Sequence, residues 1–115
     1  MNADELRARV RAFSLRIVKL VQSLPRNMVA DVLGKQLLRS ATSVGANYRA
    51  ACRAQSDPMF IAKLSIVVEE ADETVYWLEL LRDSGLVKPE LLIELLDEAE
   101  QLVKIMSASR KTARH

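Results

Sequence analysis

Apolar residues recur every three or four positions along four stretches of the chain, and short segments containing proline or glycine separate the stretches. This spacing places the apolar side chains on one face of a helix and leaves the opposite face polar. In the first stretch, Leu6, Val10 and Phe13 share such a face. The pattern predicts helices over residues 4–24, 27–54, 58–83 and 89–107, followed by a basic tail over residues 108–115.

The segments between the stretches carry residues that begin and end helices. Asn27 is a good N-cap for the second helix, and Asp57 as N-cap with Pro58 at the first helical position predicts the start of the third. Gly85, in a left-handed conformation, is predicted to end the third helix. Short connections make successive helices antiparallel neighbours. We therefore predict an all-α fold, an antiparallel up-down-up-down four-helix bundle, as a single domain over residues 1–115.

A row of polar side chains runs beside the apolar stripe of the second helix at the same helical spacing. The antiparallel arrangement places Arg39 near Glu70 and Glu73 of the third helix. A carboxylate close to the core needs a partner, so we predict an ion pair of Arg39 with Glu70 or Glu73. The structural polar network that we expect comprises Arg39, Ser40, Ser43, Asn47, Glu70, Glu73 and Trp77. In the same helix, Gly45 indicates the close approach of another backbone.

Residue patterns for catalysis or metal binding are missing. Di-iron bundles use Glu-x-x-His pairs, whereas the one histidine here is His115, in the tail. Cys52 has no histidine near it in the sequence, and there is no G-x-S-x-G motif or phosphate-binding glycine loop. We therefore predict a non-enzymatic protein with no catalytic residues, no metal site, no cofactor and no small-molecule substrate.

The cysteine content and the apolar runs indicate the cellular compartment of the protein. A single cysteine, Cys52, excludes an internal disulfide and is typical of a reducing compartment, where we expect it to be a half-buried small hydrophobe. No apolar run approaches the roughly 20 residues that a membrane span needs. Asp4 and Glu5 are unlike a secretory signal. We expect a cytoplasmic protein with no membrane contact.

Charge is unevenly distributed, although the net charge is only +2. Residues 1–55 hold ten basic and three acidic side chains, whereas residues 56–109 hold four basic and twelve acidic ones. Two interpretations stay open: the two halves attract each other, within or between subunits, or the basic face binds nucleic acid, RNA or DNA. The candidate nucleic-acid contacts are Arg7, Arg11, Arg16, Lys19, Arg49 and Arg53.

Apolar residues also lie outside the main stripes, among them Ile61, Val68 and Leu80 of the third helix. Because one bundle has one central core, a second apolar surface predicts self-association. We expect Tyr76 and Trp77 to lie in the core or in a subunit interface, with base stacking as the alternative.

Matches to a known family run from Leu33 to Val87. They are Gln36, Leu37, Arg39, Ser40, Ala41, Ser43, Val44, Ala46, Asn47, Tyr48, Phe60, Ile61, Glu70, Glu73, Trp77 and Leu78. With these residues the chain closely resembles the small four-helix-bundle proteins encoded in intervening sequences of bacterial 23S ribosomal RNA genes.

The resemblance implies an antiparallel four-helix bundle that assembles as a homopentamer. It also implies kinship with the accessory variability protein of diversity-generating retroelements, a basic pentameric bundle that binds nucleic acid and the reverse transcriptase. This chain differs from that protein because it is near neutral and its second half is acidic.

Two functions follow as hypotheses. The first is a non-enzymatic, homo-oligomeric, ring-like scaffold, pentameric by the resemblance, that binds RNA, other nucleic acid or a ribonucleoprotein through its outer arginines. The alternative is a protein–protein adaptor for a partner encoded nearby, with no direct nucleic-acid binding.

Overall fold

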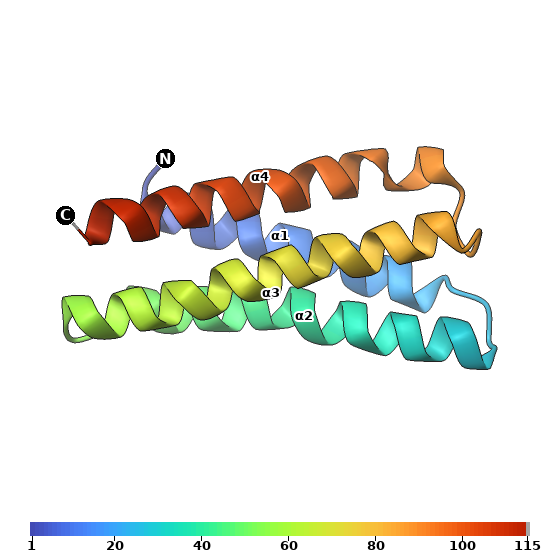
Figure 1. Cartoon of the computed structure of the whole chain (residues 1–115), viewed down its shortest axis with the longest axis horizontal. Helices are drawn as coiled ribbons and strands as arrows, with labels where there is room; N and C mark the ends of the chain where they lie inside the picture. Colours follow the sequence, from blue (N-terminus) through green and yellow to red (C-terminus); the bar gives the residue numbers. More distant parts are fainter. Residues whose placement is uncertain (115) are drawn as a thin grey trace.

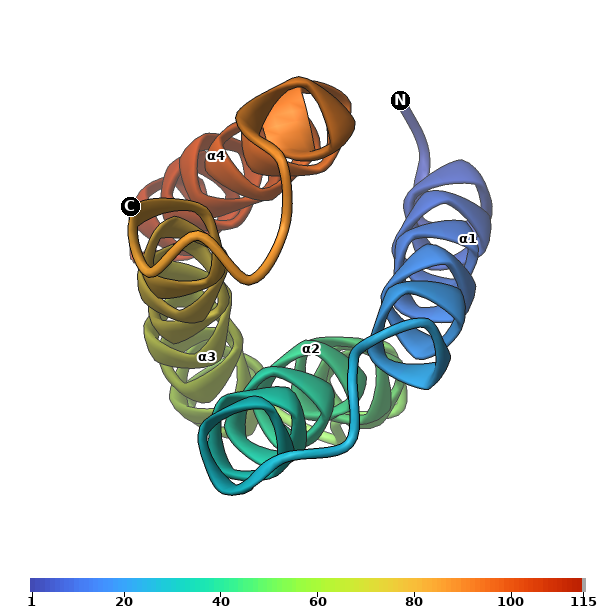
Figure 2. The same ribbon diagram turned by 90° about the vertical axis from the view of Figure 1, so that its right-hand side faces the viewer.

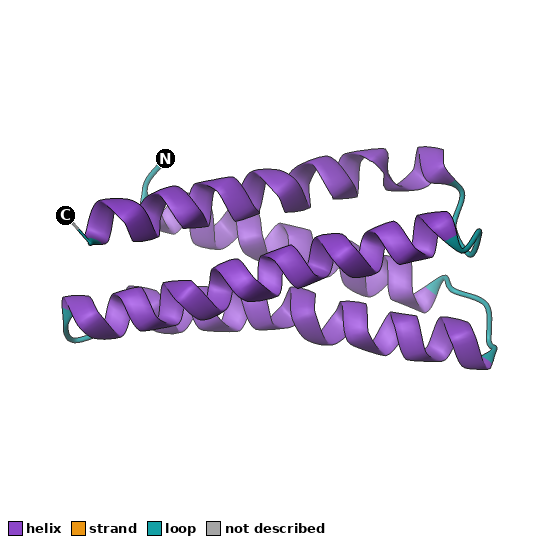
Figure 3. Ribbon diagram, viewed as in Figure 1, coloured by secondary structure: helices purple, strands orange, loops and turns teal. Residues whose placement is uncertain are grey.

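The computed structural model describes residues 1–114, which form four long helices and no strand (Figures 1 and 3). The helices are α1 (Ala3–Gln22), α2 (Met28–Cys52), α3 (Asp57–Asp83) and α4 (Pro89–Ala113). They run alternately up and down, so that both ends of the chain lie at the same end of the bundle (Figure 1). The predicted all-α four-helix bundle is confirmed.

Side-chain caps set the starts of the helices. The Asn27 side chain accepts a hydrogen bond from the backbone N–H of Ala30 at 2.9 Å, as the sequence predicted. At the start of α3 the prediction is wrong by one residue, because Ser56 is the N-cap instead of Asp57. Ser56 has the extended backbone that an N-cap requires, and its hydroxyl accepts from the N–H of Met59 at 3.3 Å. Gly85, with φ +78°, follows the end of α3 as predicted.

The last helix is longer than the sequence predicted. α4 continues past Ser107 to Ala113, so most of the predicted tail is helical, while His115 lies outside the described residues. Met106 is completely buried and anchors this end of α4. Arg110 and Lys111 lie in the last turn, where positive charge interacts favourably with the helix dipole. The sequence prediction ended the helix too early because the apolar stripe ends at Met106.

The helices follow one another around a shared core in the order α1, α2, α3, α4 (Figure 2). Every helix contributes to the core, because each buries part of its apolar stripe. Side chains with no exposed surface include Ile17, Leu37, Leu64, Leu78, Leu92 and Met106. No helix among the described residues combines the length and the apolar character needed to cross a membrane.

Candidate nucleic-acid interface

The basic side chains of α1 point in two directions. A helix turns about 100° per residue, so Arg7 and Arg11 face α2 while Arg9 and Arg16 face α4. The Arg9 guanidinium binds both carboxylate oxygens of Glu98, at 2.7 and 2.5 Å. Hydrogen bonding to Glu98 is the main cause that raises the pKa of Arg9 above its ordinary value. Arg9 therefore holds α1 against α4 and is occupied by that contact.

Arg7 and Arg11 meet Arg49 of α2 at a groove between α1 and α2 with a volume of about 310 Å³. Its apolar part is formed by residues of both helices, Val10, Gly45, Ala46 and Tyr48. Ser14 and Thr42 add one hydroxyl from each helix. No carboxylate belongs to the described lining of this groove. The arrangement is a cationic rim over an apolar floor, which suits an anionic ligand with an apolar part.

The three arginines of the rim differ in what already contacts them. Arg11 and Arg49 are exposed, and neither forms an ion pair with any residue that the structure describes. Arg7 forms an ion pair with Asp4, one turn earlier in α1, but the Asp4 side chain is 83% exposed. Exposed pairs of this kind contribute about 0–1 kcal/mol. A phosphate can therefore replace Asp4 as the partner of Arg7 at little cost.

The remaining predicted contacts do not join this groove. Arg16 lies on the α4 side of α1, where its guanidinium is 3.4 Å from Glu94. Lys19 is exposed in the last turn of α1 and lies outside the groove lining. Arg53 is exposed at the C-cap of α2, beyond the groove but at the same end of the bundle.

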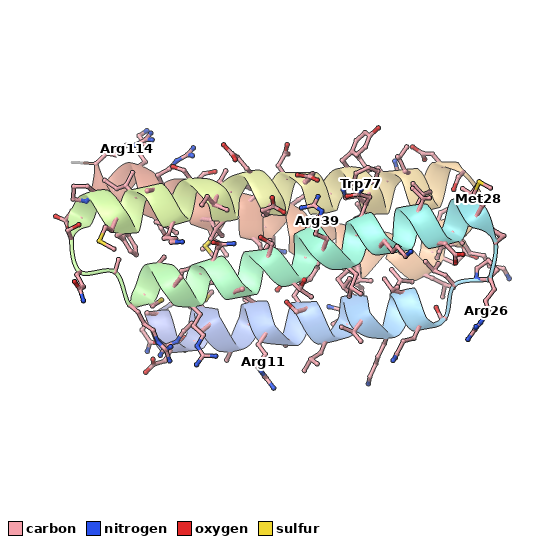
Figure 4. The ribbon with its side chains drawn as sticks, turned by 90° about the horizontal axis from the view of Figure 1, so that it is seen from below. Arg11, Arg26, Met28, Arg39, Trp77 and Arg114 are labelled. Carbon is pink, nitrogen blue, oxygen red and sulfur yellow. The ribbon has the colours of Figure 1, made fainter. Side chains whose placement is uncertain are left out.

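Further basic residues at this end were missed by the sequence prediction. Because α4 is helical through Ala113, Arg110, Lys111 and Arg114 together line a hollow at its C-terminal end. This is the end of the bundle that also holds the N-terminus (Figure 1), and Arg26 lies at the opposite end (Figure 4). The basic composition of the tail was the signal that could have identified these residues. Because the predicted helix ended too early, the sequence did not place them on α4.

Arg39 is the centre of a separate polar cluster on the outer side of α2 and α3. Its guanidinium lies 3.1 Å from Glu70 and also contacts Glu73, so it bridges both carboxylates. Gln36 accepts a further hydrogen bond from Arg39 at 3.1 Å. The Trp77 indole donates to Glu73 at 3.4 Å, which links the aromatic side chain to the cluster (Figure 4).

The polar row beside this cluster divides into two parts. Ser40 is completely buried, and its hydroxyl lies 2.9 Å from that of Thr74, a partner that the sequence prediction did not include. Asn47 donates to Ser43 at 2.9 Å within α2. Because Ser43 and Asn47 contact each other instead of Arg39, the predicted row divides into one pair between α2 and α3 and one pair within α2. Thr74 could have been found from its position on the core side of α3, one turn after Glu70.

Three further expectations concern single residues. Cys52 is half-buried, as expected. The expected backbone approach at Gly45 is wrong, because the atoms nearest to a Cβ there belong to side chains of Ser14 and Val10. Tyr76 is 52% exposed, so its ring lies outside the core of the bundle, edge-on to Trp77 with ring centroids 5.0 Å apart.

Comparison with known proteins places this bundle in a family. A family model described as 23S rRNA-intervening sequence protein matches residues 5–108. A crystal structure of a protein with unknown function from the S23 ribosomal protein family of Bacteroides thetaiotaomicron has a TM-score of 0.89 and 37% sequence identity. The similarity covers 96% of this chain and 99% of that one. A search among curated proteins found no match. The chain belongs to the 23S rRNA-intervening sequence protein family.

Proposed function

We propose that this protein is a non-enzymatic, homo-oligomeric scaffold that binds RNA, or a ribonucleoprotein, through the groove between α1 and α2. The observation that carries the proposal is the rim of Arg7, Arg11 and Arg49 around a groove whose described lining includes no carboxylate. Phosphate groups are the natural partners of such a rim, because guanidinium groups bind phosphate with two parallel hydrogen bonds.

Three phosphate contacts in one protomer make a weak site, so oligomerisation is part of the proposal. Repeating the groove around a ring raises the apparent affinity without any new contact. Exposed apolar side chains for assembly lie at the start of α2 (Met28, Val29) and of α4 (Leu91, Ile93). These two helix starts are at the end of the bundle away from the termini (Figure 1). Assembly there leaves the basic end accessible, and the pentamer implied by the resemblance is the ring that we propose.

The test is RNA binding measured over a range of salt concentrations. Each phosphate contact with a single strand contributes about −0.7 to the slope of log affinity against log salt, so three contacts give a slope of about −2 per protomer. The double variant Arg11→Gln/Arg49→Gln removes two contacts, lowers the affinity and reduces the slope. Arg26→Gln is the matched control, because Arg26 is exposed at the other end of the bundle, and it leaves binding unchanged.

Three results contradict this proposal. Affinity that is independent of salt excludes binding dominated by phosphate contacts. Equal losses in the Arg26→Gln control and in the double variant place the interface elsewhere. A monomer in solution, measured by mass, removes the ring and its gain in affinity.

The second candidate function is an adaptor for a protein encoded nearby, and the exposed Tyr76 beside Trp77 favours it. Tyrosine, tryptophan and arginine dominate binding energy at protein interfaces, and Arg39 lies in the same cluster. Under this alternative, Tyr76→Ala abolishes retention of the co-encoded protein, and nuclease treatment does not. Retention that nuclease abolishes excludes the adaptor.

A further inference from the structure

Gly45 lies at a position of α2 where alanine would make the helix more stable. It lies in the interior of the helix, and glycine there is less favourable than alanine because it has more conformational freedom to lose. Packing against neighbouring side chains does not require a glycine at this position. A Cβ at this position would lie 3.4 Å from Ser14 Oγ and 3.5 Å from Val10 Cγ1, which are ordinary van der Waals distances.

Gly34, in the first half of the same helix, gives the contrasting case. A Cβ there would lie 3.1 Å from Leu24 Cδ1, closer than side chains normally approach. Gly34 is buried, so packing between α1 and α2 accounts for it. Gly45 is only partly buried and lines the groove, where the missing methyl group leaves space beside Ser14 and Val10.

The floor and the rim of the groove make different demands on a ligand. Arginine side chains on the rim need an anion, whereas Gly45 and Ala46, above the buried Val10 and Tyr48, offer apolar surface that a phosphate alone does not use. At about 310 Å³ the groove is at the small end of the range for ligand sites, which begins near about 300 Å³. This size suits one flat group better than a stack of paired bases.

The groove also offers hydrogen-bond acceptors at its walls. Ser14 donates to the carbonyl of Val10 at 3.1 Å, and Thr42 donates to the carbonyl of Leu38 at 2.7 Å. Ser14 also has the carbonyl of Ala41 in α2 as an acceptor, at 3.4 Å. Since each hydroxyl uses its single hydrogen on a backbone carbonyl, lone pairs of both oxygens are left to accept from the N–H groups of a base.

We propose that the groove receives one unstacked nucleotide, with its base on the floor at Gly45 and its phosphates held by Arg11 and Arg49. This inference rests on the proposed RNA-binding function and specifies the form of RNA that is bound. A base in a duplex stays in its stack, and taking it out costs the free energy of unpairing and unstacking. Single-stranded or bulged RNA therefore binds more tightly than a duplex of the same sequence.

The variant Gly45→Ala tests the inference, because stability and binding move in opposite directions. Alanine raises the melting temperature through its better helix propensity and places a methyl group on the floor of the groove. The methyl group displaces the base from the floor, so we expect about a tenfold loss of affinity for a single-stranded RNA oligonucleotide. Affinity for the same sequence as a duplex stays unchanged. Gly34→Ala is the matched control, and it lowers the melting temperature while preserving the preference for the single strand.

The outcomes separate this inference from the function on which it rests. If Gly45→Ala leaves single-strand affinity unchanged, or lowers single-strand and duplex affinity equally, the nucleotide pocket is wrong. The RNA-binding function survives that result as long as Arg11→Gln/Arg49→Gln still weakens binding. A wild-type protein that binds neither form of RNA overturns both.

Discussion

Ser40 and Thr74 face each other across the interface of α2 and α3, with their hydroxyl oxygens 2.9 Å apart and neither side chain exposed to solvent. Ser40 donates to the carbonyl of Leu37 at 3.2 Å, while Thr74 has two acceptors for its single hydrogen, Ser40 Oγ and the carbonyl of Glu70 at 2.8 Å. The described part of the chain has no buried side-chain nitrogen or oxygen without a partner. This pair therefore fixes the rotation of α2 against α3 while satisfying its own hydrogen bonds.

Removing one hydroxyl of this pair is expected to destabilise the bundle. Thr74→Val keeps the shape of the side chain, takes a hydrogen-bond partner from buried Ser40, and lowers the free energy of unfolding by about 1–2 kcal/mol. The double variant Ser40→Ala/Thr74→Val loses less free energy of unfolding than the sum of the single variants. The reason is that removing both hydroxyls leaves neither one buried without its partner. Urea unfolding measures these differences. Strictly additive costs would show that the two hydroxyls do not interact.

The bridge from Arg39 to two carboxylates predicts a salt-sensitive loss of stability. Arg39→Ala leaves Glu70, whose side chain is only 18% exposed, without a cationic partner. We expect the free energy of unfolding to fall by about 1 kcal/mol at low salt and by less at high salt. Thermal unfolding at both salt concentrations provides the measurement.

Arg82→Ala is the control for this prediction. Arg82 pairs with its neighbour Asp83 at the surface, and the pKa of Asp83 is lowered chiefly by that hydrogen bond. Loss of a pair between adjacent exposed residues leaves the melting temperature unchanged. An Arg39→Ala variant that melts no lower than the wild type contradicts the structural role assigned to Arg39.

Tyr48 predicts a loss of stability at high pH. Burial, followed by hydrogen bonding to Cys52, raises the pKa of Tyr48 from 10.0 to about 12. Because the folded state holds this proton more tightly than the unfolded state, the contribution to stability is complete below pH 10.0 and is lost as the pH rises to about 12. Tyr48→Phe removes that part of the pH dependence, which urea unfolding on both sides of the window measures.

If Tyr48→Phe and the wild type lose stability in parallel above pH 10, the titration of Tyr48 is not the cause.

Much of the fold could be predicted because helix formation and burial leave a regular trace in the order of residues. The stripe of Leu6, Val10, Phe13 and Ile17 is buried as its spacing indicates. Asn27 begins α2 for a local reason, the bond from its side chain to the backbone of Ala30. Such short-range effects depend on neighbours in the chain, so they can be recognised without knowing where the other helices lie.

The sequence by itself determined the four helices, their antiparallel order and the family signature around Arg39. The tertiary structure alone decided which basic residues meet. Arg7 and Arg9 are two positions apart, yet Arg7 lines the groove beside α2 while Arg9 is held by Glu98 of α4. Thr74 likewise gains its role from Ser40, far away in the chain. The physical reason is that a helical stripe fixes which face turns inward, whereas the partners at its two edges depend on which helix packs on each side and at what height.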